Sequence, residues 1–575
     1  MSVANLAQYV LFLAIVIVLV RPIGDYLYRV FNGQETLLDG ALRPVERMLY
    51  RAAGIDPNAE MNWRQYAIAF TAFGLAGTAL LFGVLMLQRS LPWFDAGHQT
   101  TPMTLDLALN TAISFATTTT WQAYGGETTM SYFSQIVGLA AQNFLAGAAG
   151  LAVGVAFIRG LARERTNALG NFWVDLPRAA LWVLLPASLI GGLLLVWQGV
   201  PMNFAPYTNA TTLEGASQAI AQGPVAALEA IKNLGTNGGG FFNVNGAHPF
   251  ENPTPLTNLL EMLMIAALPA SLTYTFGRWV GNPRQGWMLF WVMTAMFAAG
   301  LAAMAWAEQS PPAFYAQLGV DTHTSVAQPG GNMEGKEARF GVHASALAAV
   351  TTSNGATGSY NSMHDSFTPL GGMVPLVNML LGEVVYGGLG SGLYSMVMIA
   401  LVAVFMGGLM IGRTPEYLGK QLTAHEMKLI ALYMIVGAMT LSPLTAFAVA
   451  TDLGRAGLTT NQGPHGFSEV FYAYASSLAN NGQNFAGLSA NTVFYNLTTA
   501  IAMLIGRYGF ATLALALAGA FAAQGRRAVS LGTLATDSLP FAVLLLATIL
   551  VVTGLSYFPH LALGPIAEQL GPAAP

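Results

Sequence analysis

Long apolar runs alternate with polar loops along the whole chain. A helix that crosses the hydrocarbon core of a bilayer needs about 20 mainly apolar residues. About ten runs are of this kind, and they cover residues 5–21, 66–87, 129–158, 179–198, 256–277, 286–306, 372–412, 429–450, 490–524 and 539–559. Strands of a membrane β-barrel would alternate apolar and polar positions, and these runs do not. The pattern therefore predicts an all-α polytopic membrane protein with about ten transmembrane helices.

Four of the polar loops contain stretches in which glycine and small polar residues are concentrated. These stretches are Thr117–Glu127 (TTTTWQAYGGE), Leu234–Phe242 (LGTNGGGFF), Thr351–Ser359 (TTSNGATGS) and Leu478–Gly487 (LANNGQNFAG). Trp121 and the glycines of the three Asn-Gly pairs, Gly238, Gly355 and Gly482, follow one another in steps of 117, 117 and 127 residues. This near-constant step predicts four pseudo-symmetric repeats of helix, pore loop and helix, with one extra transmembrane helix at each end.

The repeat divides the chain into six parts. A first transmembrane helix with a cytoplasmic segment is followed by repeats 1 to 4 and a last transmembrane helix, at residues 1–64, 65–160, 179–280, 284–413, 427–525 and 538–560. A short amphipathic run precedes each loop, at residues 107–117, 222–234, 341–351 and 467–478. We interpret these runs as half-helices whose partially negative C-terminal ends point at a cation. Ordinary turns in external loops are the alternative, and the regular step argues against it.

The composition agrees with a chain that lies mostly in lipid. Of the 575 residues, 54% are hydrophobic and 9% are charged, whereas soluble domains carry about 25% charged residues. The formal net charge of -4 is too small for this length to suggest a nucleic-acid partner. The absence of cysteine excludes disulfides and thiolate-ligated metals.

The basic residues predict the orientation of the chain in the membrane. Seventeen lysines and arginines fall on one side of the predicted bundle, five fall on the other, and Arg507 lies inside an apolar run. Because cytoplasmic loops carry the excess of basic residues, both termini and the long loops are expected outside. These loops are residues 88–128, 199–255, 307–371 and 451–489.

The residue types in the four loops favour a monovalent cation as the ligand. Glycine lets the backbone turn successive carbonyl oxygens inward, and a ring of such dipoles can replace the hydration shell of K⁺. The cores of the loops contain no Asp or Glu, whereas Ca²⁺, Mg²⁺ and Zn²⁺ sites usually use carboxylates or imidazoles. K⁺ or Na⁺ is therefore expected, and no organic cofactor is expected.

The sequence contains no recognisable site for ATP hydrolysis. Lysine occurs only at positions 232, 336, 420 and 428, and none of them completes the phosphate-binding pattern G-x-x-x-x-G-K-[ST]. An Asp-Lys-Thr-Gly phosphorylation sequence is also absent, and the largest inside segment is residues 22–65. No catalytic residue is therefore predicted, and active transport would need a second chain that supplies the energy.

Several long motifs resemble the potassium-binding subunit family of the bacterial Kdp-type potassium-transporting ATPase. They are GTNGGGFFN, AHPFENPTPLTN, SNGATGS, LLGEVVYGGLGSGLYSM and NNGQNFAGL, and the resemblance covers essentially the whole chain. The repeat plan alone would indicate only the wider superfamily of Trk, Ktr and HKT potassium transporters. The resemblance implies that K⁺ enters from the periplasm, binds in a selectivity filter and passes sideways to a separate P-type ATPase subunit. It also implies small accessory subunits and a bacterial inner membrane. A self-sufficient Trk/Ktr-like channel or symporter is the alternative.

The resemblance also implies which residues form the K⁺ filter. In chain order they are Thr119, Thr120, Gln122, Thr236, Asn237, Gly238, Ser353, Asn354, Gly355, Asn480, Asn481 and Gly482. No glycine aligns in the first loop, where the family often has asparagine at the position of Thr120.

Two features inside the predicted membrane add a candidate gate. The stretch GGLGSG, with Gly387, Gly388, Gly390 and Gly392, interrupts the run 372–412. We interpret it as an unwound segment that blocks a straight path to the cytoplasm, and close helix packing through small residues is the alternative.

Arg507 lies near the middle of its run, where a charge usually faces a cavity or a partner. It is expected either to oppose downward exit of the ion or brace a filter loop, or to pair with a carboxylate such as Glu383. Glu127 and Glu251 near the outer mouth either attract cations or are solvated surface residues.

Overall fold

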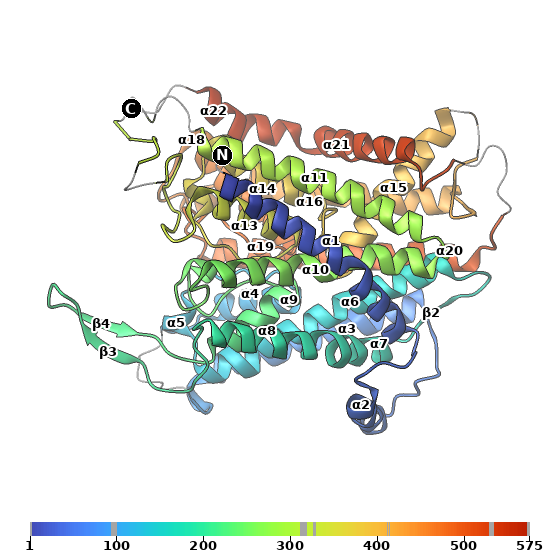
Figure 1. Cartoon of the computed structure of the whole chain (residues 1–575), viewed down its shortest axis with the longest axis horizontal. Coiled ribbons are helices and arrows are strands. Elements are labelled where there is room, and N and C mark those ends of the chain that lie inside the picture. Colours follow the sequence, from blue (N-terminus) through green and yellow to red (C-terminus); the bar gives the residue numbers. More distant parts are fainter. Residues whose placement is uncertain are drawn as a thin grey trace.

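The computed structural model describes residues 3–93, 101–310, 315, 319–325, 329–410, 412, 414–527 and 534–571 of the chain. Within these residues, ten helices are long and apolar enough to cross a bilayer, which confirms the predicted all-α polytopic fold. They cover Asn5–Phe31, Trp63–Ser90, Ser134–Ala162, Phe172–Trp197, Pro255–Trp279, Pro283–Gln309, Ser391–Met410, Ala424–Ala450, Val493–Ala523 and Leu539–Leu570. The first and the last described residues lie at the same end of the bundle (Figure 1).

Some of these spans consist of several helical segments joined by short π-helical turns. The spanning elements are α1 (Val3–Phe31), α3 (Trp63–Leu87), α6 (Ala141–Ala162), α7 (Phe172–Arg178), α8 (Leu185–Trp197), α10 (Pro255–Trp279), α11 (Pro283–Gln309), α15 (Ser391–Met410), α16 (Ala424–Ala450), α19 (Val493–Leu504), α20 (Phe510–Ala523) and α21 (Leu539–Leu561). The π-helical turns are Ser134–Ala140, Ala179–Leu184, Ile505–Gly509 and Ala562–Ile566.

The remaining elements lie between or beside the spans, except Gln88–Ser90 and α22, which end two of them. Short helices are α2 (Asp39–Ala53), α5 (Gly126–Thr129), α14 (Pro369–Leu380), α17 (Asp452–Arg455), α22 (Ala567–Leu570) and the 3₁₀ turns Gln88–Ser90, Asn245–Ala247 and His364–Ser366. In the described ranges, three antiparallel strand pairs join β1 (Met61–Asn62) to β2 (Ala168–Gly170), β3 (Thr208–Thr211) to β4 (Ser217–Ile220) and β5 (Glu416–Tyr417) to β6 (Lys420–Gln421).

The run 372–412 is not one helix but two, separated by a non-helical segment. α14 ends at Leu380 and α15 begins at Ser391, so residues 381–390 form an irregular break. Gly382, Glu383, Tyr386 and Gly390 have φ values of 77°, 59°, 48° and 93° within this break, and a right-handed helix cannot include such residues. The break therefore begins at Leu381, well before the predicted GGLGSG stretch, and Gly392 belongs to the first turn of α15.

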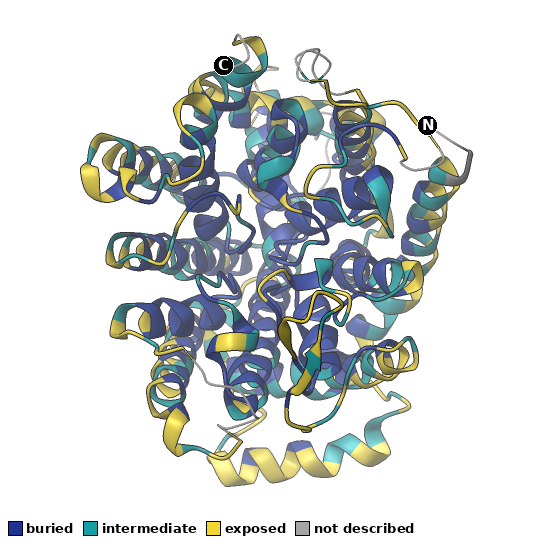
Figure 2. Cartoon of the chain, turned by 90° about the vertical axis from the view of Figure 1, so that its left-hand side faces the viewer, coloured by how far each residue is buried: buried dark blue, intermediate teal, exposed yellow. Residues whose placement is uncertain are grey.

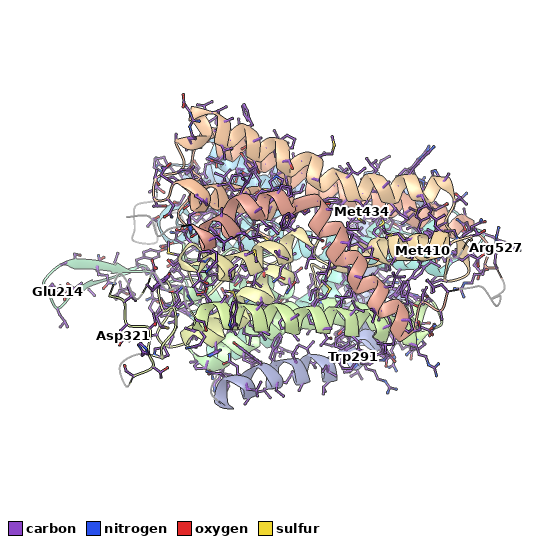
Figure 3. All side chains as sticks on the ribbon, turned by 90° about the horizontal axis from the view of Figure 1, so that it is seen from above. Glu214, Trp291, Asp321, Met410, Met434 and Arg527 are labelled. Atoms are coloured by element: carbon purple, nitrogen blue, oxygen red, sulfur yellow. The ribbon has the colours of Figure 1, made fainter. Side chains whose placement is uncertain are left out.

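The bundle has a buried centre, and basic loops meet at one of its ends. Seen along its long axis, the helices surround a buried interior and expose residues at the rim (Figure 2). Glu214, in the β3–β4 hairpin, and Arg527 lie at opposite ends of the molecule (Figure 3). The basic loops that contain Arg163 and Arg526 approach each other, since Arg526 contacts both Glu164 and Ala162 O.

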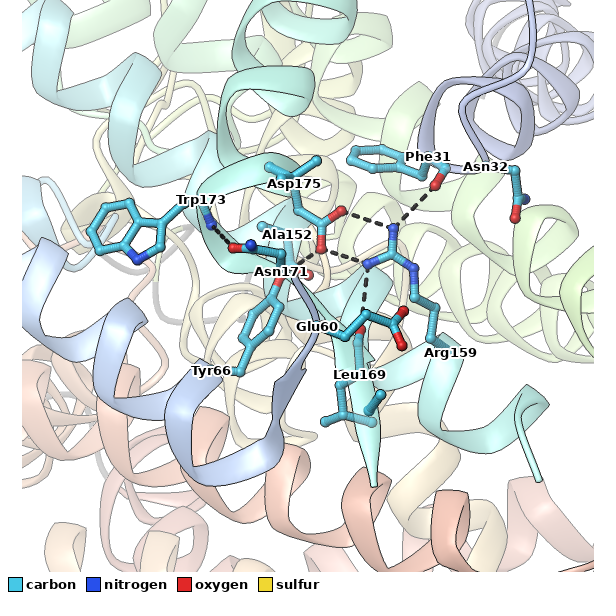
Figure 4. A network of polar contacts seen from close by, with 12 residues as sticks. Phe31, Asn32, Glu60, Tyr66, Ala152, Arg159, Leu169, Asn171, Trp173 and Asp175 are labelled. Carbon is cyan, nitrogen blue, oxygen red and sulfur yellow. Dashed lines mark hydrogen bonds and ion pairs between the residues drawn. The ribbon is translucent and has the colours of Figure 1, made fainter. Parts of the chain in front are cut away.

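A buried ion pair joins four helices near the basic end (Figure 4). Arg159 of α6 bonds to both carboxylate oxygens of Asp175 of α7, at 2.5 and 2.8 Å, and donates to Phe31 O of α1 at 3.1 Å. Tyr66 of α3 donates to Asp175 Oδ2 at 3.0 Å and to Ala152 O at 2.8 Å. Since buried charges are tolerated only when they are paired and hydrogen-bonded, this network fixes where α1, α3, α6 and α7 meet.

Candidate cation site

Four short helices end where the glycine- and threonine-rich loops begin. They are α4 (Leu105–Ala116), α9 (Val225–Leu234), α13 (Gly341–Asn354) and α18 (Gly463–Leu478). Their positions confirm the four predicted half-helices to within four residues at each end, and α13 ends three residues later than expected. The last carbonyl groups of a helix carry partial negative charge, so four such ends face the loops that follow.

The loops that follow these helices are Thr117–Gln122, Gly235–Gly240, Gly355–Tyr360 and Ala479–Gln483, and together we call them the loop ring. The second residue after each helix has a left-handed backbone: φ is 62° at Thr118, 48° at Thr236, 51° at Ala356 and 52° at Asn480. Left-handed φ at a non-glycine residue costs about 1–3 kcal/mol. The same strained conformation in four loops indicates a backbone shaped for a purpose other than stability.

Two residues further along, three of the loops are left-handed again. The φ values are 52° at Thr120, 96° at Gly238 and 86° at Gly482. Alternation of left- and right-handed residues turns successive carbonyl groups toward the same side of a chain, which is the arrangement that carbonyl-lined ion filters use. Thr120 adopts this conformation although it is β-branched, for which a positive φ is unusual.

The four loops contact one another in cyclic order. Thr120 Oγ1 donates to Asn237 O at 2.7 Å, and Gly358 N donates to the same oxygen at 3.2 Å. A Cβ atom added to Gly358 would lie 2.8 Å from Asn481 O, and one added to Gly482 would overlap the backbone of the first loop. The loop ring is therefore closed, and at three of its four equivalent positions only glycine allows the approach.

Ten of the predicted filter residues lie in the loop ring, namely Thr119, Thr120, Gln122, Thr236, Asn237, Gly238, Gly355, Asn480, Asn481 and Gly482. Several of their side chains connect loops to their neighbours. Gln122 accepts a bond from Gly240 N at 2.8 Å and donates to Gly240 O at 3.1 Å. Asn480 Nδ2 donates to Thr119 Oγ1 at 2.9 Å, and Asn481 Nδ2 donates to Ser353 O at 3.1 Å. These amides brace the ring.

The third loop does not have the predicted register. Ser353 and Asn354 lie in the last turn of α13, and Gly355 is the residue that follows the helix. Ser353 Oγ donates to Ala349 O at 2.6 Å, within its own helix. The prediction failed because an Asn-Gly pair is as suitable for ending a helix as for a pore loop.

The residues of the third loop that match the other loops are Ala356, Thr357 and Gly358. Gly358, not Gly355, contacts the second and fourth loops. The signal for this register is the G-x-x-G spacing that Gly235–Gly238 shares with Gly355–Gly358. With this register, Gly238, Gly358 and Gly482 follow one another in steps of 120 and 124 residues, which is more regular than the Asn-Gly step.

The two glutamates expected at the outer mouth both bond to residues just after the second loop. Glu127 Oε2 accepts from Asn243 N at 2.9 Å, and the fully buried Glu251 accepts from Phe241 N at 2.6 Å. Glu251 is thus neither solvated nor exposed to entering ions. Burial raises the pKa of Glu251 to about 8, although Lys232 at 4.0 Å opposes that rise.

Lys232 belongs to a buried cluster that the sequence did not reveal. It contacts Glu229 Oε2 at 2.8 Å, and both side chains are completely inaccessible to solvent. The i,i+3 spacing within α9 would have allowed this pair to be expected, since such residues share a helix face. The cluster anchors the second pore helix directly before its loop.

A cavity of about 120 Å³ lies against the left-handed residues of the loop ring. Each loop contributes one of them to its wall: Thr118, Thr236, Ala356 and Asn480. The wall continues past Tyr394 of α15 and Tyr433 of α16 to Ser556 of α21. The cavity therefore connects the ring to the outer helices on one side of the bundle.

The non-helical break 381–390 contributes another part of the cavity wall through Glu383, Gly388 and Leu389. Leu389 N donates to Thr236 Oγ1 at 3.0 Å, which ties the break to the second loop. Gly390 packs so closely on α6 that a Cβ atom there would lie 3.0 Å from Gly154 N. The break thus includes Gly387, Gly388 and Gly390. It is an unwound segment that also packs closely on a helix, so the unwinding and the close packing expected as alternatives both occur in the GGLGSG stretch.

Arg507 also lines the cavity and bonds to its walls. Its Nη1 donates to Thr118 Oγ1 at 3.1 Å, and its Nη2 donates to Ala146 O of α6 at 2.7 Å. Among the described residues it has no ion pair within 4.0 Å, and Glu383 instead accepts from Ser391 Oγ at 2.8 Å. The expected direct pair between Arg507 and Glu383 is therefore not formed, and Arg507 braces the first loop.

In the described part of the chain, ten membrane spans, four half-helices and a closed ring of loop backbone define a membrane transport protein with re-entrant pore loops. Comparison with known sequences identifies the family. The sequence profile described as "KdpA: Potassium-transporting ATPase A subunit" matches residues 10–570, and the chain belongs to this family.

Curated relatives and a solved structure agree with this assignment. A protein of Methylorubrum extorquens, named "Potassium-transporting ATPase potassium-binding subunit", is 52% identical over 100% of this chain and 99% of the relative. A protein of the same name from Rhodopseudomonas palustris is 50% identical, with coverage of 100% and 99%. The crystal structure of the potassium transporter TrkH from Vibrio parahaemolyticus has a TM-score of 0.52 at 13% identity, covering 78% of this chain and 82% of that chain. This last likeness concerns the fold alone.

Proposed function

We propose that the chain binds K⁺ in the loop ring and passes it to a separate P-type ATPase subunit for ATP-driven, high-affinity uptake. The observation that carries the proposal is the closed ring of four loops with a cavity against its left-handed residues. The names of the curated relatives support K⁺ as the ion and an ATPase complex as the context. The filter residues are proposed with Ala356, Thr357 and Gly358 in place of Ser353, Asn354 and Gly355.

The chemistry of the ring favours a monovalent ion over a divalent one. None of the four ring segments contains Asp or Glu, so the ligands are neutral oxygens of the backbone and of Thr and Asn side chains. Such oxygens balance the modest hydration energy of K⁺, whereas divalent ions need carboxylates. The partially negative ends of α4, α9, α13 and α18 add attraction for one positive charge.

The cavity supplies the proposed route from the ring to a partner. Its wall extends to α15, α16 and α21, so an ion that leaves the ring moves sideways along the cavity while the break 381–390 and Arg507 oppose direct exit. We place this chain in the bacterial inner membrane with both termini in the periplasm, together with a catalytic ATPase subunit and small accessory subunits. We propose that the chain is built from four repeats of helix, pore loop and helix, with one further transmembrane helix at each end.

The test is K⁺-stimulated ATP hydrolysis by the purified complex that contains the Gly238→Ala variant. Gly238 has a φ of 96°, and a Cβ there would overlap Gly358 N. We expect the K⁺ concentration for half-stimulation to rise at least about ten-fold, which corresponds to about 1.4 kcal/mol. Gly215→Ala is the matched control, because Gly215 has a φ of 84° and no atom within 4 Å of the added Cβ.

The K⁺ response of the Gly238→Ala complex distinguishes the proposed filter from the alternatives. A shifted K⁺ response in Gly238→Ala, with normal assembly and a normal Gly215→Ala complex, supports a filter coupled to the ATPase of a partner. An unchanged K⁺ response contradicts the proposed site. K⁺ flux through this chain alone in liposomes, without any ATPase subunit, would instead support a self-sufficient channel or symporter.

A further inference from the structure

A cluster of four ionisable side chains lies outside the loop ring, where three separate parts of the chain meet. Asp365 lies in the 3₁₀ turn after the third loop, His465 and Glu469 lie at the start of α18, and Glu568 lies in α22. One potential metal-ligating atom from each of Asp365, His465 and Glu469 falls within 4.8 Å of the others. The transport function proposed above makes no use of these residues.

The imidazole of His465 has a different partner on each ring nitrogen. Nδ1 lies 2.8 Å from Glu568 Oε1, while Nε2 lies 2.9 Å from Asp365 Oδ1 and 4.0 Å from Glu469 Oε1. A histidine that binds a metal through Nε2 typically donates its Nδ1–H to a carboxylate, which fixes the tautomer and the ring orientation. Glu568 occupies the position of that carboxylate, and the Nε2 lone pair faces Asp365 and Glu469.

Glu469 gives a second and independent indication of a cation site at this cluster. Its side chain is 0% exposed, and Asn461 Nδ2 donates to its Oε1 at 2.7 Å. Among the described residues, Oε2 has no hydrogen-bond partner. A buried carboxylate oxygen without a partner is costly, and a cation beside it would remove that cost.

The backbone at Gly487 leaves space for an ion between Asp365 and Glu469. A Cβ atom on Gly487 would lie 2.7 Å from Asp365 Oδ2 and 2.6 Å from Thr460 Oγ1. It would also crowd Glu469 Oε1. Glycine at position 487 therefore keeps a small space open between the two carboxylates.

We propose that Asp365, His465 and Glu469 form a binding site for a divalent metal of the zinc type, with Glu568 as the positioning carboxylate. One imidazole nitrogen and two carboxylate oxygens are a ligand set that Zn²⁺ accepts, with water in the fourth position. Zinc–ligand bonds of about 2.0–2.2 Å place neighbouring ligand atoms roughly 3.4 Å apart. The distances of 2.9 and 4.0 Å from His465 Nε2 lie on either side of that value.

A metal-free cluster is the competing arrangement. A protonated His465 would then bridge Asp365 and Glu568, as an imidazolium between two carboxylates. That arrangement leaves the buried Glu469 Oε2 unpaired among the described residues and leaves three carboxylates with one positive charge. A divalent ion offsets the charges of its two ligating carboxylates, Asp365 and Glu469, while Glu568 accepts the imidazole Nδ1–H.

The site would act as a brace. It joins the third repeat, the N-terminal end of the fourth pore helix and the C-terminal helix α22. α18 leads directly into the loop with Asn480 and Gly482, so a metal at its start restrains the helix that presents the fourth loop.

The experiment is to load the intact purified complex with zinc, to remove free metal by dialysis and to measure bound metal by plasma mass spectrometry. We expect one tightly bound zinc per chain in the wild-type protein. We expect its loss in His465→Ala and in Glu469→Gln, the latter being nearly isosteric. The control is His425→Ala, which removes an exposed histidine at the start of α16 and is expected to leave zinc binding intact.

A second readout separates metal binding from simple misfolding. Chelation should lower the melting temperature of the wild-type and His425→Ala complexes and leave that of assembled Glu469→Gln unchanged. Wild-type protein that binds no more zinc than Glu469→Gln overturns the proposal. Binding of calcium in preference to zinc also overturns it, because it would show that His465 is not a ligand.

Discussion

At the scale of single residues, the Arg507 side chain holds the first loop of the ring in place. It reaches Thr118 Oγ1 with one guanidinium nitrogen and Ala146 O with another. A planar guanidinium presents these donors in a fixed fork, whereas a lysine ammonium is a point charge on a flexible stem. Thr118 has a strained, left-handed backbone, so a rigid contact is needed to hold it.

The structure therefore predicts that Arg507→Lys fails almost as badly as Arg507→Gln. Lysine keeps the positive charge but loses at least one bond, and a hydrogen bond to a charged group contributes about 1.5–3 kcal/mol. We expect both variants to need roughly ten-fold more K⁺, or more, for half-stimulation of the ATPase of the complex. A lysine variant with a wild-type K⁺ response, beside a defective glutamine variant, would show that charge alone matters.

At the scale of elements, the break between α14 and α15 is held by contact with α6. Gly150 and Gly154 of α6 face Leu389 and Gly390 across a gap with no room for a side chain. Small residues allow helix backbones to approach closely in membranes, and here they let a non-helical segment do the same. The break is consequently fixed on one side by α6 and on the other by its bond to Thr236.

Gly390→Ala is predicted to loosen this contact and to open the floor of the cavity. An added Cβ would lie 3.0 Å from Gly154 N and would overlap Gly150 O, so the break must move away from α6. We expect passive rubidium leak from liposomes that contain the complex without ATP. Gly382→Ala is the control, since Gly382 has a φ of 77° in the same break and no atom within 4 Å of the added Cβ. Equal leak in both variants would assign the effect to backbone strain and not to the contact.

At the scale of the whole molecule, the Arg159–Asp175 pair and the loop ring hold the two ends of the bundle by different means. The pair joins α1, α6 and α7 through a bidentate ion pair and a bond to Phe31 O. Removal of one partner of a buried pair leaves an uncompensated charge, which costs about 3–5 kcal/mol.

Arg159→Ala is therefore predicted to lower the melting temperature of the protein in detergent by several degrees, as followed by intrinsic fluorescence. The comparison is Arg455→Ala, because Arg455 is 53% exposed and its partner Asp452 is 97% exposed. An exposed pair contributes only about 0–1 kcal/mol, so this variant should melt close to wild type. Equal melting of the two variants would contradict the importance assigned to the Asp175 network.

The sequence was sufficient for the spans, since apolar length and basic loops depend on the bilayer rather than on tertiary detail. It was also sufficient for the pore helices and for three of the four loops. The sequence could not distinguish two roles of the same Asn-Gly pair. Asn354-Gly355 ends a helix, whereas Asn237-Gly238 forms part of a loop. It could not place Thr120 in a left-handed conformation, which only the surrounding ring enforces.

Contacts between distant segments could not be predicted from the sequence either. Asp365 and His465 are 100 positions apart, and His465 and Glu568 are 103 positions apart. No periodicity relates them, because they lie in three separate elements, a 3₁₀ turn, α18 and α22. The sequence also left the partner of Arg507 open between a filter loop and Glu383, and the structure shows bonds to Thr118 and Ala146.

Closure of the ring between its last and first loops has a consequence for biosynthesis. Asn480 meets Thr119 across 361 positions of the chain. At about 5–20 residues per second, the ribosome needs roughly 20 to 70 s to produce the intervening segment. For that time, the polar backbone of the first loop is already made while its fourth-loop partner does not yet exist. A nascent chain that stops before residue 480 therefore cannot close the ring, and until the fourth loop is made Thr119 needs another hydrogen-bond partner, such as water or the insertion machinery.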